Sequence, residues 1–248
     1  MEKKTKVALV TGASRGLGEA LARELVKSGW IVVGVARSGK TLDILQKAVG
    51  SNFIPYICDV SVPDQVRQVS EDLKAKGMIP SLFFLNAGIA GEAACESSVE
   101  FTAAKHKEIF ATNYFGVLLW VEQWLPTLKD EKATFVATGS VNAIFAPPLA
   151  SAYAASKAAI AKAFESLSLT HCGSKLVFSI VYAGPIATDG LKGTFPFTWQ
   201  PEKMAKYMIK KTSKGKTHVE NSFFYSGLSR VFRWLPNRLT MKILRCAN

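Results

Sequence analysis

Short runs of apolar, often β-branched residues recur along most of the chain, and they are separated by stretches with a different periodicity. The runs do not alternate between apolar and polar positions. Runs that are apolar throughout are typical of parallel strands buried on both faces of a sheet. We therefore predict strands at residues 6–11, 30–36, 53–58, 81–85, 132–139 and 176–182.

Stretches with helical spacing lie between these runs. The apolar residues that follow Gly16 fall on one side of a helix, which stops at Ser28-Gly29. Further helices are predicted at about 62–77, at about 99–125 and from Ser151 to about His171. This alternation predicts an α/β fold with a doubly wound, about seven-stranded parallel sheet and helices on both faces. Because no repeat or linker divides the chain, we expect residues 1–248 to form a single domain.

Composition narrows the class of protein without changing this prediction. Apolar residues make up 48% and charged residues 20% of the 248 positions, which is typical of a globular protein. The four cysteines form no CxxC pair and the three histidines are scattered, so we expect no metal site and a reduced, cytoplasmic location. The apolar run near the N-terminus is too short for a signal peptide, and no run approaches the roughly 18 residues of a membrane span.

Positive charge is concentrated at the C-terminal end. The net charge is +12, and residues 203–248 hold eleven Lys or Arg and one acid, so they carry +10 of it. Residues 223–248 form a basic amphipathic extension, for which two interpretations are open: contact with an anionic membrane surface, or packing of the apolar side on the domain. We expect no nucleic-acid binding, because no recognition motif accompanies the charge. The apolar positions with helical spacing are Leu228, Val231, Phe232 and Leu235, followed by Leu239, Ile243 and Leu244.

A glycine-rich turn joins the first predicted strand to its helix. Glycines let the backbone approach a pyrophosphate closely, and the positive end of the helix dipole favours the anion. The spacing is G-x-x-x-G-x-G rather than the general dinucleotide pattern G-x-G-x-x-G. The candidate phosphate-binding residues are Gly12, Ser14, Arg15, Gly16, Leu17 and Gly18.

The end of the second strand indicates which dinucleotide would bind. An acid at this point takes the ribose 2′-hydroxyl of NAD, whereas an Arg accommodates the 2′-phosphate of NADP. The strand here ends in Ala36-Arg37 without an acid, and Arg15 is a second candidate cation. We therefore predict NADP(H), with two solvated arginines as the alternative. After the third strand, Asp59 is a candidate for the adenine amine or simply begins the next turn.

The candidate catalytic pair is Tyr153 and Lys157. Residues four apart share one helix face, so the phenol and the ammonium would lie together. A nearby cation is expected to lower the tyrosine pKa from about 10 and to make the phenol a proton donor and acceptor. Ser140 follows the fifth strand, at the sheet edge where ligands bind. Asn113 lies inside an apolar helix, where its amide either holds a relay water or is satisfied structurally.

Together these motifs resemble the short-chain dehydrogenase/reductase family over residues 5–190. The resemblance implies a Rossmann fold, a homodimer or tetramer, and roles for four residues. Tyr153 would be the general acid/base, Lys157 would bind the nicotinamide ribose, Ser140 would hold the substrate oxygen and Asn113 would keep a relay water. The cofactor would also contact Asp59, Val60, Asn86, Ala87, Gly88, Gly184, Ile186 and Thr188.

The activity implied is NADP(H)-dependent interconversion of a ketone or aldehyde and an alcohol. The basic extension, and an aromatic segment at 191–200 that is a candidate lid or an ordinary packed loop, favour an apolar, lipid- or steroid-like carbonyl substrate. Two alternatives are a 3-oxoacyl thioester reductase of fatty-acid synthesis and a non-catalytic NADP(H)-binding regulator.

Overall fold

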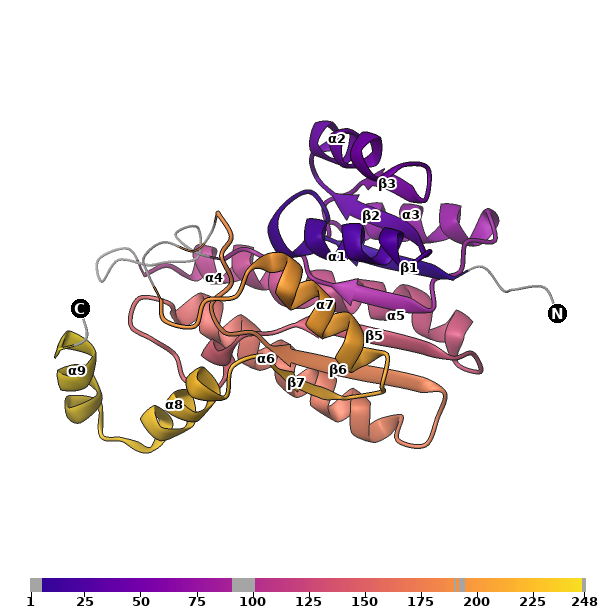
Figure 1. Ribbon diagram of the computed structural model, residues 1–248. Helices are drawn as coiled ribbons and strands as arrows, with labels where there is room; N and C mark the ends of the chain where they lie inside the picture. Colours follow the sequence, from indigo (N-terminus) through magenta and orange to yellow (C-terminus); the bar gives the residue numbers. More distant parts are fainter. Residues whose placement is uncertain (1–5, 91–100, 190, 192–194, 247–248) are drawn as a thin grey trace.

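The computed structural model describes residues 6–90, 101–189, 191 and 195–246 of the chain. Within these residues one sheet of seven strands is present, all parallel, in the order β3-β2-β1-β4-β5-β6-β7 (Figure 1). The predicted doubly wound α/β fold is therefore confirmed. The strands are β1 (Val7–Thr11), β2 (Ile31–Ala36), β3 (Phe53–Ile57), β4 (Leu82–Leu85), β5 (Ala133–Thr138), β6 (Leu176–Tyr182) and β7 (His218–Glu220).

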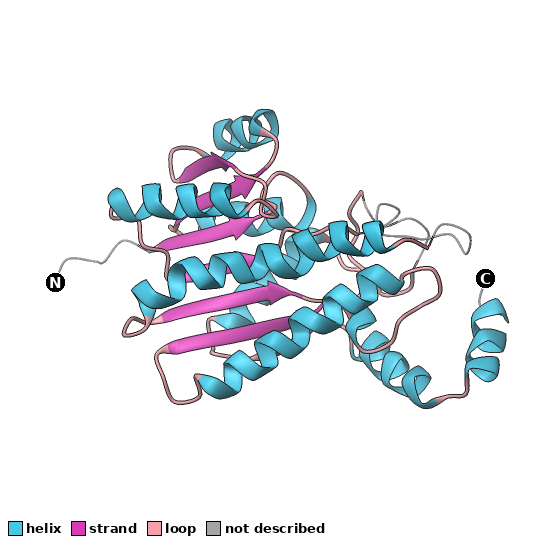
Figure 2. Ribbon diagram, turned by 180° about the vertical axis from the view of Figure 1, so that it is seen from behind, coloured by secondary structure: helices cyan, strands magenta, loops and turns pink. Residues whose placement is uncertain are grey.

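Helices cover both faces of the sheet (Figures 1 and 2). Side chains of α1, α2 and α7 pack on one face, and side chains of α3, α5 and α6 pack on the other. The helices are α1 (Gly16–Lys27), α2 (Gly39–Val49), α3 (Pro63–Ala75), α4 (Ala103–Phe110), α5 (Gly116–Leu128), α6 (Ser151–Thr170), α7 (Pro201–Thr212), α8 (Phe223–Trp234) and α9 (Asn237–Cys246).

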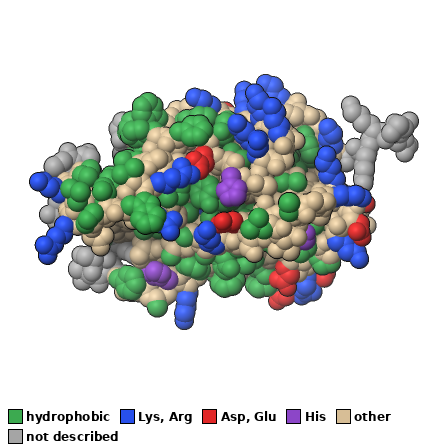
Figure 3. Space-filling model, turned by 90° about the horizontal axis from the view of Figure 1, so that it is seen from below, with side chains coloured by type: hydrophobic (Ala, Val, Ile, Leu, Met, Phe, Trp, Pro, Cys, Tyr) green, Lys and Arg blue, Asp and Glu red, His purple; other side chains and the backbone are tan. Residues whose placement is uncertain are grey.

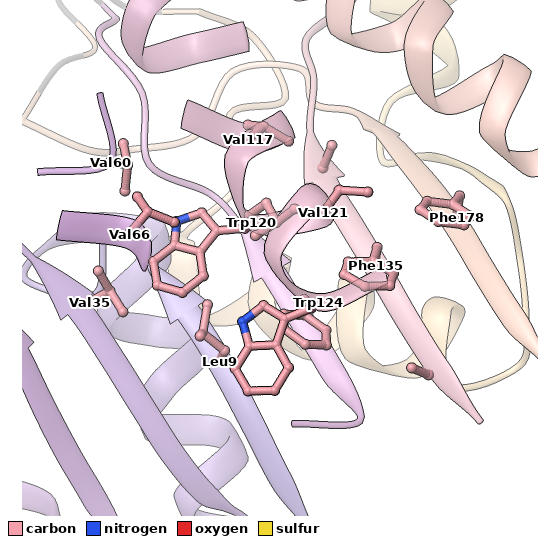
Figure 4. Close-up of a cluster of buried hydrophobic side chains, with 14 of the residues drawn as sticks. Leu9, Val35, Val60, Val66, Val117, Trp120, Val121, Trp124, Phe135 and Phe178 are labelled. Carbon is pink, nitrogen blue, oxygen red and sulfur yellow. The ribbon is translucent and has the colours of Figure 1, made fainter. Parts of the chain in front are cut away.

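The strands are buried on both faces, so each supplies side chains to two hydrophobic cores. In β1, Leu9 joins one core, while its neighbours Ala8 and Val10 join the other. The core beneath α5 contains the fully buried rings of Trp120 and Trp124, which lie over the sheet beside Leu9 (Figure 4). Burial of this kind explains why the strands are apolar throughout instead of alternating.

Three phenylalanine rings form a row across the middle of the sheet. Phe83, Phe135 and Phe178 are register partners on β4, β5 and β6. The ring centroids of Phe83 and Phe135 are 4.5 Å apart, and those of Phe135 and Phe178 are 5.1 Å apart. The ring planes are nearly parallel in both pairs. Cross-strand aromatic pairs of this kind stabilise one register against its alternatives.

The helix predicted at about 99–125 is divided in two. Among the described residues, α4 begins at Ala103, because Thr102 caps it by accepting a bond from the N–H of Lys105 at 3.2 Å. A π-helical turn, η2 (Ala111–Phe115), separates α4 from α5 and contains the predicted Asn113. Single π turns inside longer helices are frequent at functional sites.

Beyond residue 200, helix α7, which begins at Pro201, and strand β7, which is only three residues long, were not predicted. The described part of the basic extension, residues 223–246, contains the helices α8 and α9. Four residues were expected to share an apolar face, of which three lie on α8 and Leu235 follows it. Only Phe232 among them is buried, and its ring centroid lies 5.2 Å from that of Phe145. No helix in the described part of the chain is both long and apolar enough to cross a membrane.

Candidate active site

Three strand ends meet at the carboxyl edge of the sheet and are joined by side-chain hydrogen bonds. Thr11 ends β1, and its Oγ1 accepts bonds from the backbone N–H groups of Asn86 (2.9 Å) and Ala87 (3.0 Å), which follow β4. Thr138 ends β5, and its Oγ1 donates to Oδ1 of Asn86 at 3.3 Å. Because ligands of open parallel sheets bind at this edge, these contacts locate the candidate site.

The glycine turn between β1 and α1 packs tightly against this edge. A Cβ on Gly18 would lie 2.0 Å from the carbonyl oxygen of Gly12, and one on Gly12 would lie 3.0 Å from the Cα of Ala87. Gly12 also has φ of +69°, which disfavours other residues. The side chain of Arg15, the N-cap residue of α1, makes no capping bond, so the first N–H groups are available to an anion. This arrangement fits the diphosphate of a dinucleotide.

The segment that follows β6 faces the glycine turn. A Cβ on Gly16 would lie 3.1 Å from Cγ2 of Thr188. The backbone N–H of Gly184 donates to Oδ1 of Asn221 at 2.8 Å, and Ile186 forms an isolated β-bridge with the residues just before α7. Residues 192–194 of the candidate lid, which was predicted at 191–200, lie outside the described part of the chain. The predicted cofactor contacts Gly184, Ile186 and Thr188 therefore lie on one segment, and Thr188 lies beside the turn.

Lys157 and Tyr153 lie on one face of α6, as their spacing predicts. The Nζ atom of Lys157 is 5.8 Å from the centroid of the Tyr153 ring and donates to the carbonyl oxygen of Thr138 at 2.7 Å. Ser140 reaches the pair from the end of β5, where its hydroxyl hydrogen-bonds the Tyr153 side chain and favours the phenolate. A phenol, a hydroxyl and a buried ammonium thus converge at the sheet edge, and together they can hold an oxygen and exchange a proton with it.

Burial dominates the ionisation of both groups. Loss of solvent lowers the pKa of Lys157 from 10.5 to about 8. Loss of solvent raises the pKa of Tyr153, and the bond from Ser140 offsets only part of this. The prediction that Lys157 lowers the pKa of Tyr153 is corrected by this finding, because the desolvation of the phenolate outweighs other effects in the structure.

Asn113 is fully buried, and protein groups satisfy its side-chain amide. Its Oδ1 accepts from the N–H of Ile89 at 2.7 Å, and its Nδ2 donates to the carbonyl of Ile89 and to Oγ of Ser156, each at 3.1 Å. A Cβ on Gly88 would lie 3.1 Å from that Oδ1 and 3.5 Å from Nζ of Lys157. These side-chain contacts give Asn113 a structural role beside the catalytic pair, and its relay role stays a prediction.

The residues predicted for the adenosine end also lie together. Arg37 is exposed after β2, and its charge acts on Asp59 after β3. Burial would raise the pKa of Asp59, but the hydrogen bonds from the N–H and hydroxyl of Ser61, together with Arg37, lower it overall. Val60 is buried against Gly116 at the start of α5. The carboxylate of Asp59 therefore stabilises the turn after β3, which was the structural alternative predicted for this residue.

Three residues of the glycine turn differ in exposure, and two residues that position site groups were not predicted. Ser14 and Arg15 are at least partly exposed in the turn, whereas the side chain of Leu17 is buried in the core under α1. Thr138 and Asn221 hold Lys157 and Gly184 in place but were not singled out. Thr138 could have been predicted, because it precedes the glycine at the end of a predicted strand. Nothing in the sequence indicates Asn221.

Comparison with known proteins adds an independent observation. The family model described as "short chain dehydrogenase" matches residues 6–198. A protein of Arabidopsis thaliana named 11-beta-hydroxysteroid dehydrogenase-like 3 is 32% identical over 228 residues, which cover 87% of this chain and 72% of that protein. The NADPH-dependent 1-acyldihydroxyacetone phosphate reductase of Saccharomyces cerevisiae is 31% identical over 188 residues, which cover 74% of this chain and 62% of that protein.

A solved structure shares the fold. The crystal structure of a short-chain dehydrogenase from Streptomyces avermitilis superposes with a TM-score of 0.82 at 23% identity, covering 100% of this chain and 96% of that one. The similarity thus extends over the sheet and the helices that carry the site.

Proposed function

This chain belongs to the short-chain dehydrogenase/reductase family of oxidoreductases, and on that premise we propose that it interconverts an apolar ketone or aldehyde and its alcohol with NADP(H). The observation that carries the proposal is the convergence of Ser140, Tyr153 and Lys157 beside the glycine turn. When bound, the nicotinamide supplies or accepts the hydride.

The chain's own residues account for the proton and the charge. The hydroxyls of Ser140 and Tyr153 would hold the carbonyl oxygen and stabilise the negative charge that grows on it during reduction. Because burial raises its pKa, Tyr153 is protonated at neutral pH and is suited to give its proton to that oxygen. Lys157, whose pKa is about 8, can return a proton to the phenolate at little free-energy cost near neutral pH.

Preference for NADP(H) is supported by the cations at the adenosine end. Arg37 stands where an acid would select NAD, and Arg15 is exposed at the start of α1. Asp59, the acid near Arg37, directs its Oδ1 to Ser61. A 2′-phosphate would therefore meet a net positive surface.

An apolar substrate is supported by exposed apolar residues on the segments that carry the site residues. Leu149, which precedes α6, and Phe195 and Phe197, which follow Thr188, are exposed. Large exposed apolar side chains near a site favour apolar ligands. The relatives named above for a steroid and for an acyl lipid are consistent with this substrate class.

The test is NADPH consumption with a panel that includes a ketosteroid, a long-chain aldehyde, a 3-oxoacyl thioester and a polar sugar. We expect turnover with the apolar carbonyls, and we expect Tyr153→Phe to reduce it by roughly 10²- to 10⁴-fold while NADPH still binds. Tyr207→Phe is the matched control, because its hydroxyl bonds the carbonyl of Glu220 at 2.8 Å outside the site. Near-normal turnover by Tyr153→Phe would contradict the mechanism, and binding without any turnover would favour a regulator.

A further inference from the structure

Apart from Phe232, the side chains that helix α8 buries are small and polar, and most of its large apolar side chains face outward. Ser226 is fully buried, and within the described residues its Oγ has no hydrogen-bond partner. Ser222 and Ser229 are also buried on this side. By contrast, Phe223 and Trp234 are each 84% exposed. The apolar residues of the outward side, which we call the exposed face of α8, are Phe223, Phe224, Leu228, Val231 and Trp234.

This orientation is opposite to that of an ordinary surface helix, whose apolar stripe faces the core. At 3.6 residues per turn the serines and the exposed face lie on roughly opposite sides of α8. A contiguous set of large apolar side chains in water indicates a contact surface rather than scattered exposure. The inward packing of α8 therefore presents a surface for a partner.

The charge around this surface indicates the chemistry of that partner. From residue 223 to residue 248 the sequence contains five Lys or Arg and no acid. Arg233 lies on α8, and Arg238 and Lys242 lie on α9 next to exposed Leu239. Figure 3, which views the molecule from below Figure 1, shows apolar side chains with Lys and Arg among them at the end where α8 and α9 lie.

We propose that the exposed face of α8, together with α9, binds the surface of an anionic lipid bilayer. Aromatic side chains such as Trp234 and Phe223 partition into the bilayer interface, and the flanking cations are attracted to anionic headgroups. A second copy of this chain is a poorer occupant, because two copies related by a two-fold axis would bring Arg233, Arg238 and Lys242 near like charges.

The surface adjoins the substrate side of the site. The ring of Phe224 is 5.4 Å from that of Phe197, and the hydroxyl of Tyr225 donates to the carbonyl of Pro196 at 2.8 Å. Both partners belong to the segment that follows Thr188. A bilayer bound here would hold an apolar carbonyl beside the site, a consequence that rests on the proposed function, whereas the binding itself does not.

The experiment is flotation of the full chain with phosphatidylcholine vesicles and with vesicles that also contain phosphatidylglycerol. We expect binding to the anionic vesicles, weakened by salt. The double variant Arg233→Ser/Arg238→Ser should lower partitioning roughly 25-fold, at about fivefold for each charge. The variant Phe223→Ser/Trp234→Ser should also lower partitioning, by about tenfold or more. These side chains are exposed, so both variants should fold, which circular dichroism checks.

Helix α2 provides matched controls at the far side of the molecule (Figure 1). Ile44→Ser removes an exposed apolar side chain and Lys47→Ser removes an exposed cation, and neither should alter flotation. Quenching of Trp234 by brominated lipid, compared with a Trp234→Phe variant, tests insertion directly. The proposal is overturned if wild type does not float with anionic vesicles, if the Phe223→Ser/Trp234→Ser variant floats equally well, or if those substitutions instead dissociate an oligomer in sedimentation.

Discussion

The ammonium of Lys157 lies 2.7 Å from the carbonyl oxygen of Thr138, so a buried cation ties the middle of α6 to the end of β5. This bond fixes the lysine beside the ring of Tyr153 and uses one of its three donors. The remaining donors are available for a ribose or a phenolate. The position is costly for the charged form, because the surroundings exclude water.

Replacing Lys157 with methionine should separate stability from activity. Folding lowers the lysine pKa to about 8, so between pH 8 and 10.5 the unfolded chain holds a proton that the folded chain has released. Stability therefore rises with pH across this window, and at pH 7 the full cost, about 3 kcal/mol, is present. Lys157→Met removes that cost and loses a bond worth about 1 kcal/mol. We expect an inactive protein that is about 1–2 kcal/mol more stable in urea at pH 7.

The control for this substitution is Lys74→Met, which removes another lysine that donates to a carbonyl, that of Gln123 at 2.8 Å. This variant should be slightly less stable than wild type and fully active. Two results would show that the buried charge does not lower the stability of wild type. One is a lower unfolding midpoint for Lys157→Met than for wild type at pH 7, and the other is the same pH dependence of stability in both proteins between pH 8 and 10.5.

The same ionisation should set the pH dependence of reduction. With NADPH saturating, kcat/KM for the carbonyl reports ionisations of the enzyme–NADPH complex to which the carbonyl binds. Above about pH 8 Lys157 loses its proton, while Tyr153 keeps its own because burial raises the pKa of the phenol. We expect kcat/KM for reduction to fall on the alkaline side near pH 8, as measured with saturating NADPH and a varied carbonyl. A flat profile up to pH 10 would argue against a role for the lysine charge.

Cofactor preference should depend on Arg37. Losing a charge-assisted bond to a 2′-phosphate costs about 1.5–3 kcal/mol, so Arg37→Ala should raise KM for NADPH by roughly 10- to 100-fold. KM for NADH should change little, because NADH has no such phosphate. The matched control is Arg23→Ala, which removes an exposed arginine paired with Glu19 on α1. Equal losses with both cofactors would reject the NADP(H) assignment.

The glycine turn allows a steric test. A methyl group on Gly18 would lie 2.0 Å from the carbonyl of Gly12, so Gly18→Ala must displace the turn. We expect dinucleotide binding to fall below detection in calorimetry and the protein to lose a few kcal/mol of stability. Gly227→Ala in α8 is the control, because nothing lies within 4 Å of its added methyl group. That variant should gain roughly 0.5–1 kcal/mol and bind normally.

Much of the fold could be predicted because its strands are buried on both faces and their apolar runs are continuous. β7 was not predicted because it has only three residues, of which only Val219 is buried. A strand at the edge of a sheet can be this short, so it leaves no apolar run in the sequence. α7 could have been found from Pro201 at its start and from the spacing of Met204 and Met208. The π turn around Asn113 has no such pattern, since it depends on contacts with Ile89 and Ser156.

The site was predictable as a set of residues but not in its energetics. Helical spacing was enough to place Tyr153 beside Lys157. The direction of the tyrosine pKa depends on how much water the folded chain excludes, and no spacing reveals that. The exposed face of α8 could not be predicted for a related reason. Periodicity shows that a helix is amphipathic, but it does not show which side packs on the domain.

The row of rings formed by Phe83, Phe135 and Phe178 has a consequence for the catalytic edge. Asn86 follows Phe83 and Thr138 follows Phe135 by three residues along the chain, so each polar residue moves with its ring if a strand slides. A slip of one residue would turn a ring to the opposite side of the sheet and separate the Thr138 hydroxyl from Asn86. The alignment of the reacting groups therefore depends on the register of the buried strands, which is set when the strands pair and away from any substrate.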